Sequence, residues 1–151
     1  MLAQILAIKF WKIKPQWINA TDHYETLISG TTAGVVIGDR TFTLKNNFKY
    51  VYDLSGEWKN FTGLPFVFAC WVANKKLPEN FIQRLDAAFK SGIDNKEKVV
   101  DETREQYASL DIKDYFENKI SFSFDDRKKK SLELFLGYVN ELMESDLLKI
   151  V

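Results

Sequence analysis

Hydrophobic side chains recur at the three-to-four-residue spacing of an amphipathic helix in three parts of the chain. This spacing predicts helices over residues 1–11, 81–89 and 132–143, each with one continuous apolar stripe. Asp125 or Asp126 is expected to cap the last of them, since an Asp just before a helix can accept hydrogen bonds from its first free backbone N–H groups. Each stripe requires an apolar surface to cover it.

Turn and capping residues mark the boundaries of the other predicted helices. A helix over residues 53–61 is expected to be capped by Asp53 or Ser55 and to end just before Gly63. Gly92 is expected to lie beyond the end of the helix over residues 81–89. Two further helices are predicted over residues 22–29, closed by Gly30, and over residues 96–108.

Compact apolar runs between these helices predict strands. Residues 33–38 form a short apolar run bounded by Gly and Asp, and residues 64–73 contain almost no polar side chain, so both are expected to be buried strands. Apolar and polar residues alternate over residues 120–124, which predicts an extended segment. Shorter strands are expected over residues 16–20 and 49–52. Because strands alternate with helices, the pattern predicts an α/β fold.

The charge balance argues against a nucleic-acid partner. The 151 residues include 21 Lys and Arg and 21 Asp and Glu, so the formal net charge is zero. Nucleic-acid-binding proteins usually carry a basic excess or a basic stripe, and the sequence has neither. The basic run over residues 127–130 follows two aspartates, and we interpret it as the solvated start of a helix, with a phosphate-binding patch as the alternative.

Few residues are available for metal or nucleophilic chemistry. His23 is the only histidine and Cys70 the only cysteine, so a multi-histidine metal site, a catalytic triad and an internal disulfide have little support. We expect His23 to be exposed and Cys70 to be buried in its apolar run. No apolar stretch reaches the ~18 residues of a membrane span, and no leader peptide is recognisable. The sequence therefore predicts a cytoplasmic protein without a membrane partner.

Two turns are candidates for binding a ligand. Gly38 ends the predicted strand over residues 33–38 and Asp39 follows it, and open α/β sheets bind ligands at the carboxyl ends of their strands. Thr62 and Gly63 lie where a predicted helix is followed by a predicted strand. From the residues alone, a structural turn and a ligand-binding turn are equally good interpretations of each pair.

The segment that contains the second turn resembles the signature of a known family. Residues 52–71 read YDLSGEWKNFTGLPFVFACW and are similar to the signature of the chorismate dehydratase family. The Ile37-Gly38-Asp39 sequence precedes this segment at the family's distance, and residues 120–124, followed by a helix with Leu134-Phe135, resemble the family's ending. A sister family, the dihydroxynaphthoate synthases, has a Gly-rich stretch after its Leu-Pro, whereas Phe66–Trp71 is similar to the dehydratases. The resemblance extends over essentially the whole chain.

The resemblance implies a fold and a division into lobes. It implies a type II periplasmic-binding-protein-like α/β fold in which the ligand lies between two lobes. Residues 1–70 would supply the second α/β lobe, without its N-terminal start. Residues 71–151 would form the return strand and the C-terminal helices of the first lobe.

The resemblance also implies a reaction, which is the removal of water from chorismate to give 3-[(1-carboxyvinyl)oxy]benzoate in menaquinone biosynthesis by the futalosine route. No metal or cofactor is implied, and the catalytic base is not identified. Carried over position by position, the substrate-binding residues would be Gly38, Asp39, Thr62 and Gly63. The alternative is a noncatalytic module of the same fold that binds a small carboxylate.

Members of the resembled family are nearly twice as long as this chain. The resemblance places the 151 residues in their C-terminal half, whereas an Asn-containing motif and a Ser/Thr-rich helix start that contribute to the substrate site lie in their N-terminal half. We therefore expect the chain to associate with that missing half or with a second copy of itself. On its own it is expected to leave chorismate unconverted.

Overall fold

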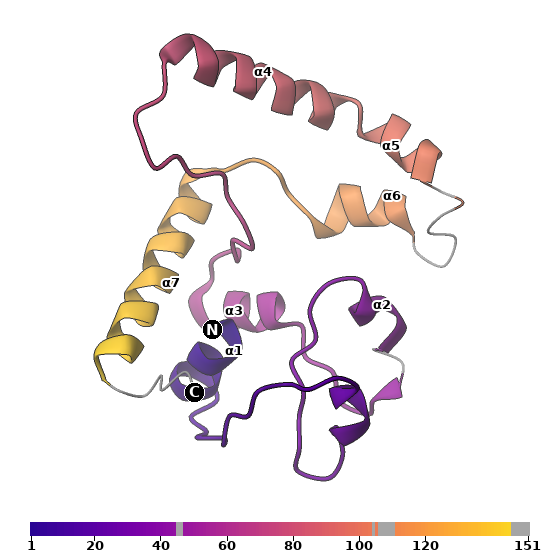
Figure 1. The fold of residues 1–151 in the computed structure, drawn as a ribbon, viewed down its shortest axis with the longest axis vertical. Helices are drawn as coiled ribbons and strands as arrows, with labels where there is room; N and C mark the ends of the chain where they lie inside the picture. Colours follow the sequence, from indigo (N-terminus) through magenta and orange to yellow (C-terminus); the bar gives the residue numbers. More distant parts are fainter. Residues whose placement is uncertain (45–46, 104, 106–110, 146–151) are drawn as a thin grey trace. The chain divides into compact units, whose positions relative to one another are not determined.

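The computed structural model describes residues 1–44, 47–103, 105 and 111–145. Its regular structure is helical (Figure 1). The α-helices are α1 (Leu2–Ile5), α2 (Arg40–Leu44), α3 (Leu54–Thr62), α4 (Glu79–Asp94), α5 (Lys96–Thr103), α6 (Ile112–Asp114) and α7 (Asp126–Glu144). A 3-10 turn covers Tyr24–Leu27, and π-helical turns extend α1 over Leu6–Phe10 and α6 over Tyr115–Lys119.

The helices with strong apolar stripes or clear caps are confirmed. The predicted helix over residues 1–11 corresponds to α1 and its π-helical extension. Asp53 caps α3 by accepting a hydrogen bond from the backbone N–H of Ser55, and Gly63 ends the helix in the left-handed conformation (φ 73°). Of the two candidate caps for α7, Asp125 is the one used, since its carboxylate accepts from the backbone N–H of Lys128.

Other boundaries differ from the prediction. Gly92 lies within α4, which continues to Asp94, because a glycine whose φ is not positive can stay in a helix at a modest cost. The predicted helix over residues 96–108 is formed as far as Thr103, while residues 104 and 106–108 lie outside the described part of the chain. The short helix α6 was not predicted, although Asp111 caps it as an Asp is expected to do.

The predicted α/β fold is wrong for the described residues. None of them is in a strand, so the type II periplasmic-binding-protein-like arrangement is not formed. Residues 33–38, 64–73 and 120–124 lack the ladder partners that define a sheet. An apolar run predicts a buried strand only if neighbouring strands pair with its backbone and other side chains cover its faces.

Many side chains of these runs are exposed, although residues 64–67 are half-buried. Ile37 and Trp71 are each 82% exposed, and Val72 is 86% exposed. Cys70, expected in the core, is also exposed. Burial requires a covering element as well as an apolar side chain, and Ile37 and Val72 have little cover within the described chain.

Two compact units divide the chain. The first comprises residues 1–68 and 125–145 of the described chain, and the second comprises Ala69–Phe124. The core of the first unit is built from Ile5, Trp58 and Leu142, which are at most 1% exposed. These residues come from α1, α3 and α7, so the core joins segments that are far apart in the sequence.

Aromatic rings surround Trp58 in this core. Its ring lies 5.9 Å from that of Phe135 and 6.2 Å from that of Tyr138, both nearly edge-on, and 5.8 Å from that of Phe66. Such edge-to-face pairs add a directional preference to the burial of apolar area. The apolar stripe predicted over residues 132–143 is thus covered in part by α3.

The second unit has a much smaller core. Among its described residues, Ile112 is the buried hydrophobic side chain, at 8% exposed. The ring of Trp71 packs 5.5 Å from that of Phe89, and the ring of Phe116 packs 6.2 Å from that of Phe122. No described residue of α4 is buried, so the stripe predicted over residues 81–89 is left largely open.

Candidate functional site

The turn formed by Thr62 and Gly63 closes the C-terminus of α3. The Thr62 hydroxyl donates to the carbonyl oxygen of Trp58 at 2.8 Å and accepts from the backbone N–H of Leu64 at 3.1 Å. The Gly63 N–H donates to the carbonyl oxygen of Lys59 at 2.8 Å. The two residues therefore supply the bonds that end the helix, as a C-cap requires.

A side chain from α7 also binds this turn. The Arg127 guanidinium Nη2 donates to the Gly63 carbonyl oxygen at 2.8 Å, a bond that spans 64 positions of sequence. One helical turn further along α7, the Ser131 hydroxyl accepts from the Trp58 indole N–H at 2.8 Å. Both bonds hold the end of α3 against the same helix, so α7 fixes the position of the Thr62–Gly63 turn.

Gly38 and Asp39 form a bend directly before α2. Gly38 has a φ of 80°, and its carbonyl oxygen accepts from both the backbone N–H and the hydroxyl of Thr41, at 3.0 and 2.8 Å. The Asp39 carbonyl oxygen accepts from the N–H of Phe42 at 3.1 Å. Since no strand forms over residues 33–38, the expectation that these residues lie at a strand's carboxyl end is wrong. Both are exposed at the start of a helix instead.

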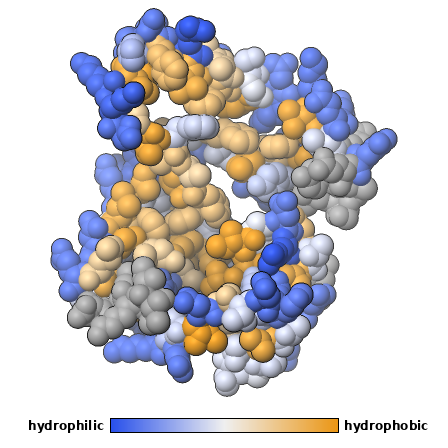
Figure 2. Space-filling model, viewed as in Figure 1, coloured by the Kyte–Doolittle hydropathy of each residue, from blue (hydrophilic) through white to orange (hydrophobic). Residues whose placement is uncertain are grey.

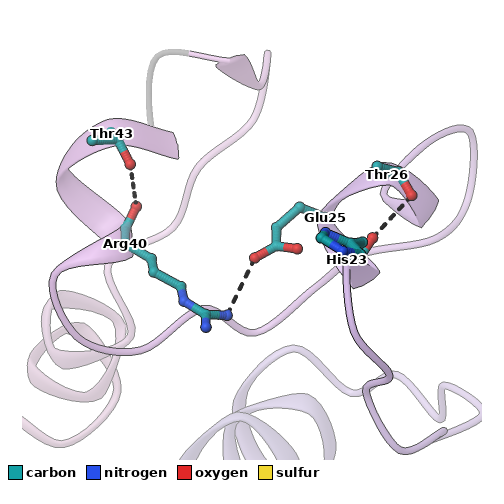
Figure 3. A network of polar contacts seen from close by, with 5 residues as sticks. All are labelled: His23, Glu25, Thr26, Arg40 and Thr43. Carbon is teal, nitrogen blue, oxygen red and sulfur yellow. Dashed lines mark hydrogen bonds and ion pairs between the residues drawn. The ribbon is translucent and has the colours of Figure 1, made fainter.

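An open hollow of about 730 Å³ lies beside this bend, lined by residues 20–25 and by Arg40. In Figure 3 the Arg40 side chain extends from α2 toward Glu25, with which it forms an ion pair at 3.5 Å. The same view shows the Thr26 hydroxyl donating to the His23 carbonyl oxygen, at 2.9 Å. His23 is exposed, as expected, and has a left-handed backbone (φ 60°).

The charges of the hollow do not favour an anionic ligand. Asp22 and Glu25 contribute two carboxylates, whereas Arg40 contributes one guanidinium that already pairs with Glu25. Like charges at short range disfavour a bound carboxylate. The hollow is thus poorly suited to an organic acid.

The two predicted turns belong to the same unit. In the part of the chain that the structure describes, no hydrogen bond or ion pair joins Gly38 or Asp39 to Thr62 or Gly63. Arg127 belongs to the basic run interpreted as the solvated start of a helix, and it is exposed there. The sequence pattern does not indicate its bond to Gly63, because only the packing of α7 on α3 determines which cation of the run reaches Gly63.

Neither a metal cluster nor a membrane span is found in the described chain. Residues 1–44, 47–103, 105 and 111–145 contain no group of three or more His, Cys, Asp and Glu side chains placed to hold a metal ion. Within the same residues, no helix has the length and apolar character needed to cross a bilayer.

The chain belongs to the menaquinone biosynthesis family, whose match covers residues 1–141. This is the family of the chorismate dehydratases, so the resemblance carried by residues 52–71 is confirmed at the level of the family. No solved structure matches the chain.

Proposed function

We propose that this chain forms part of a cytoplasmic hydro-lyase that converts chorismate to 3-[(1-carboxyvinyl)oxy]benzoate. The observation that carries the proposal is the family match over residues 1–141, together with the dehydratase-like segment over residues 52–71. Phe66–Trp71 favours the dehydratase over the sister synthase.

The reaction removes a proton and a hydroxide from the substrate ring. A carbon–hydrogen bond and a carbon–oxygen bond break, the electron pair of the first forms the last double bond of the aromatic ring, and water is released. Aromatisation supplies much of the driving force, so the protein has mainly to orient a dianion and to stabilise the charge that develops. A carboxylate of the substrate can serve as the base.

The exposed apolar surface supports the proposal that this chain works with a further protein segment. Large hydrophobic side chains are exposed in both units, whereas soluble monomers seldom expose extended apolar patches. Figure 2 shows hydrophobic side chains on the surface, and Ile37, Trp71 and Val72 are among the most exposed.

We propose that a further protein segment, the N-terminal half expected from the family resemblance, covers this surface. A second copy of the chain is the other partner that would bury it. A noncatalytic carboxylate-binding module remains the second candidate function, because the turns described above contain no identified catalytic base.

Sedimentation and a chorismate-consumption assay test the proposal. Alone at micromolar concentration, the chain is expected to associate and to leave chorismate unchanged. The gene upstream of Met1 can be read for an Asn-containing motif and a Ser/Thr-rich helix start. Coexpressed with a segment that has both, the chain should consume chorismate and release the benzoate product.

Two outcomes would contradict this. A stable monomer with full turnover would rule out the half-enzyme proposal. An assembled complex that binds chorismate without converting it would instead establish the noncatalytic module.

A further inference from the structure

The Thr62–Gly63 turn has few donors left for a ligand. The Thr62 hydroxyl donates to Trp58, the Gly63 N–H donates to Lys59 and the Leu64 N–H donates to Thr62. Each of these groups would have to give up a bond that ends α3 before it could bind an anion. The turn therefore cannot hold a carboxylate with its own groups at low cost.

The Arg127 guanidinium, beside the same turn, has N–H donors that are not used by its bond to Gly63. A guanidinium carries five N–H groups, and the bond recorded for Arg127 among the described residues uses one of them, on the Gly63 carbonyl oxygen. Its acidic neighbours are engaged elsewhere, since Asp125 caps α7 and Asp126 pairs with Lys129 at 3.1 Å. The guanidinium is thus held beside the turn with most of its donors available.

The space beside Gly63 is open. Apart from its own chain neighbours, a side chain added at Gly63 would meet no atom within 4 Å of its first carbon. A planar carboxylate could approach the turn there and accept two parallel hydrogen bonds from a guanidinium, the geometry in which Arg binds carboxylates best.

The charge of the proposed substrate requires such a group. Chorismate carries two carboxylates, whereas the four predicted site residues, Gly38, Asp39, Thr62 and Gly63, contribute one negative charge and no positive one. Binding a dianion in that setting needs a compensating cation close to the turn.

We propose that Arg127 is a substrate-binding residue that holds a carboxylate of the ligand at the Thr62–Gly63 turn. The choice of this turn and of chorismate as the ligand rests on the proposed function, whereas the donors available on Arg127 are observed in the structure. Its guanidinium binds the Gly63 carbonyl oxygen on one side and the carboxylate on the other.

Calorimetric titration of the 151-residue chain with isophthalate, an aromatic dicarboxylate, and separately with chorismate tests the site. Arg127→Gln should weaken the binding of both by about tenfold or more, the loss expected for a charge-assisted pair. Arg127→Lys should lie between this variant and the wild type. Lys130→Gln removes the same charge from the same helix and should leave the affinities unchanged.

Salt dependence and amide signals separate binding from a purely structural role. The wild-type affinity should fall as salt is added, and this dependence should be smaller in Arg127→Gln. A Gln at position 127 is too short to reach the Gly63 carbonyl oxygen as the Arg127 guanidinium does, so the loss of this bond is followed separately through the Gly63 amide signal of the free variant. Weaker binding in Arg127→Gln with an unchanged salt dependence would show a purely structural role and overturn the proposal.

The remaining outcomes are also decisive. If the wild type binds neither ligand, or if Arg127→Gln binds both as well as the wild type does, Arg127 is not a carboxylate-binding residue. If isophthalate binds through Arg127 and chorismate does not bind, the carboxylate site stands and the proposed function fails.

Discussion

The Trp58 indole N–H donates to the Ser131 hydroxyl at 2.8 Å. Trp58 is fully buried, and Ser131 is 1% exposed. The two residues are 73 positions apart, on α3 and α7. The bond satisfies a donor that would otherwise be enclosed among Phe66, Phe135 and Tyr138.

Ser131→Ala should lower the free energy of unfolding by about 1–3 kcal/mol, because the Trp58 N–H would be left buried without an acceptor. Urea denaturation followed by fluorescence measures this. Ser29→Ala, at an exposed position, is the control and should change the value by less than about 0.5 kcal/mol. Equal effects of the two substitutions would show that the buried bond contributes nothing.

Asp125→Ala should destabilise α7 by about 1 kcal/mol, because the backbone N–H of Lys128 would lose its acceptor. Asp126→Ala is the matched control, since the Asp126 carboxylate makes an exposed ion pair with Lys129, and such pairs contribute little. Thermal unfolding followed by circular dichroism compares the two. A larger loss in Asp126→Ala would mean that the wrong aspartate had been identified as the cap.

Two glycines should respond to alanine in opposite directions. Gly63→Ala should cost about 1 kcal/mol, because φ is 73° there and a Cβ disfavours the left-handed conformation. Gly92→Ala should stabilise α4 by about 0.5–1 kcal/mol, since the position is helical and nothing lies within 4 Å of the added Cβ. Denaturant midpoints of both variants against the wild type check the signs, and a shared sign would contradict the argument.

The pKa of Asp114 lies below its ordinary value, chiefly because the Asn118 side-chain amide donates to its carboxylate at 2.8 Å and also because Lys119 is nearby. A lowered pKa stabilises the folded state above the ordinary Asp pKa of about 3.9, and this contribution is lost as the pH falls through the lowered value. Asn118→Ala should therefore raise the pKa of Asp114, as measured by carbon NMR of the carboxyl group. Asn95→Ala, whose amide binds the carbonyl oxygen of Ser91, should leave that pKa in place.

The sequence predicted local helix signals well. Caps such as Asp53 and Asp125, and the terminating Gly63, act within a few residues of their own position, so their effect can be read from the chain alone. The stripe over residues 132–143 predicted α7 itself, whereas its packing on α1 and α3 of the same unit could not be predicted from the pattern.

Strands were not predictable in the same way. The apolar run over residues 64–73 indicates only that its side chains favour burial. A strand forms in a sheet only when another backbone segment pairs with it through hydrogen bonds. Trp71 is exposed because that partner is not provided by the described residues.

The residues of the candidate site also differ in how far they could be predicted from the sequence. Thr62 and Gly63 could be selected from a turn pattern and a family signature, but the contact of Arg127 with Gly63 depends on how α7 lies against α3. No periodicity distinguishes Arg127 from the three lysines that follow it.

The core of Ile5, Trp58 and Leu142 has a consequence for the order of events during synthesis. Ribosomes release a chain from its N-terminus, at about 5–20 residues per second, and domains tend to fold as they emerge. Here Ile5 and Trp58 emerge long before Leu142, so the indole ring has no enclosing α7 until Asp126–Glu144 have been made. Throughout that interval its hydrophobic surface is open to chaperones, which makes Trp58 a natural position at which to detect nascent-chain binding.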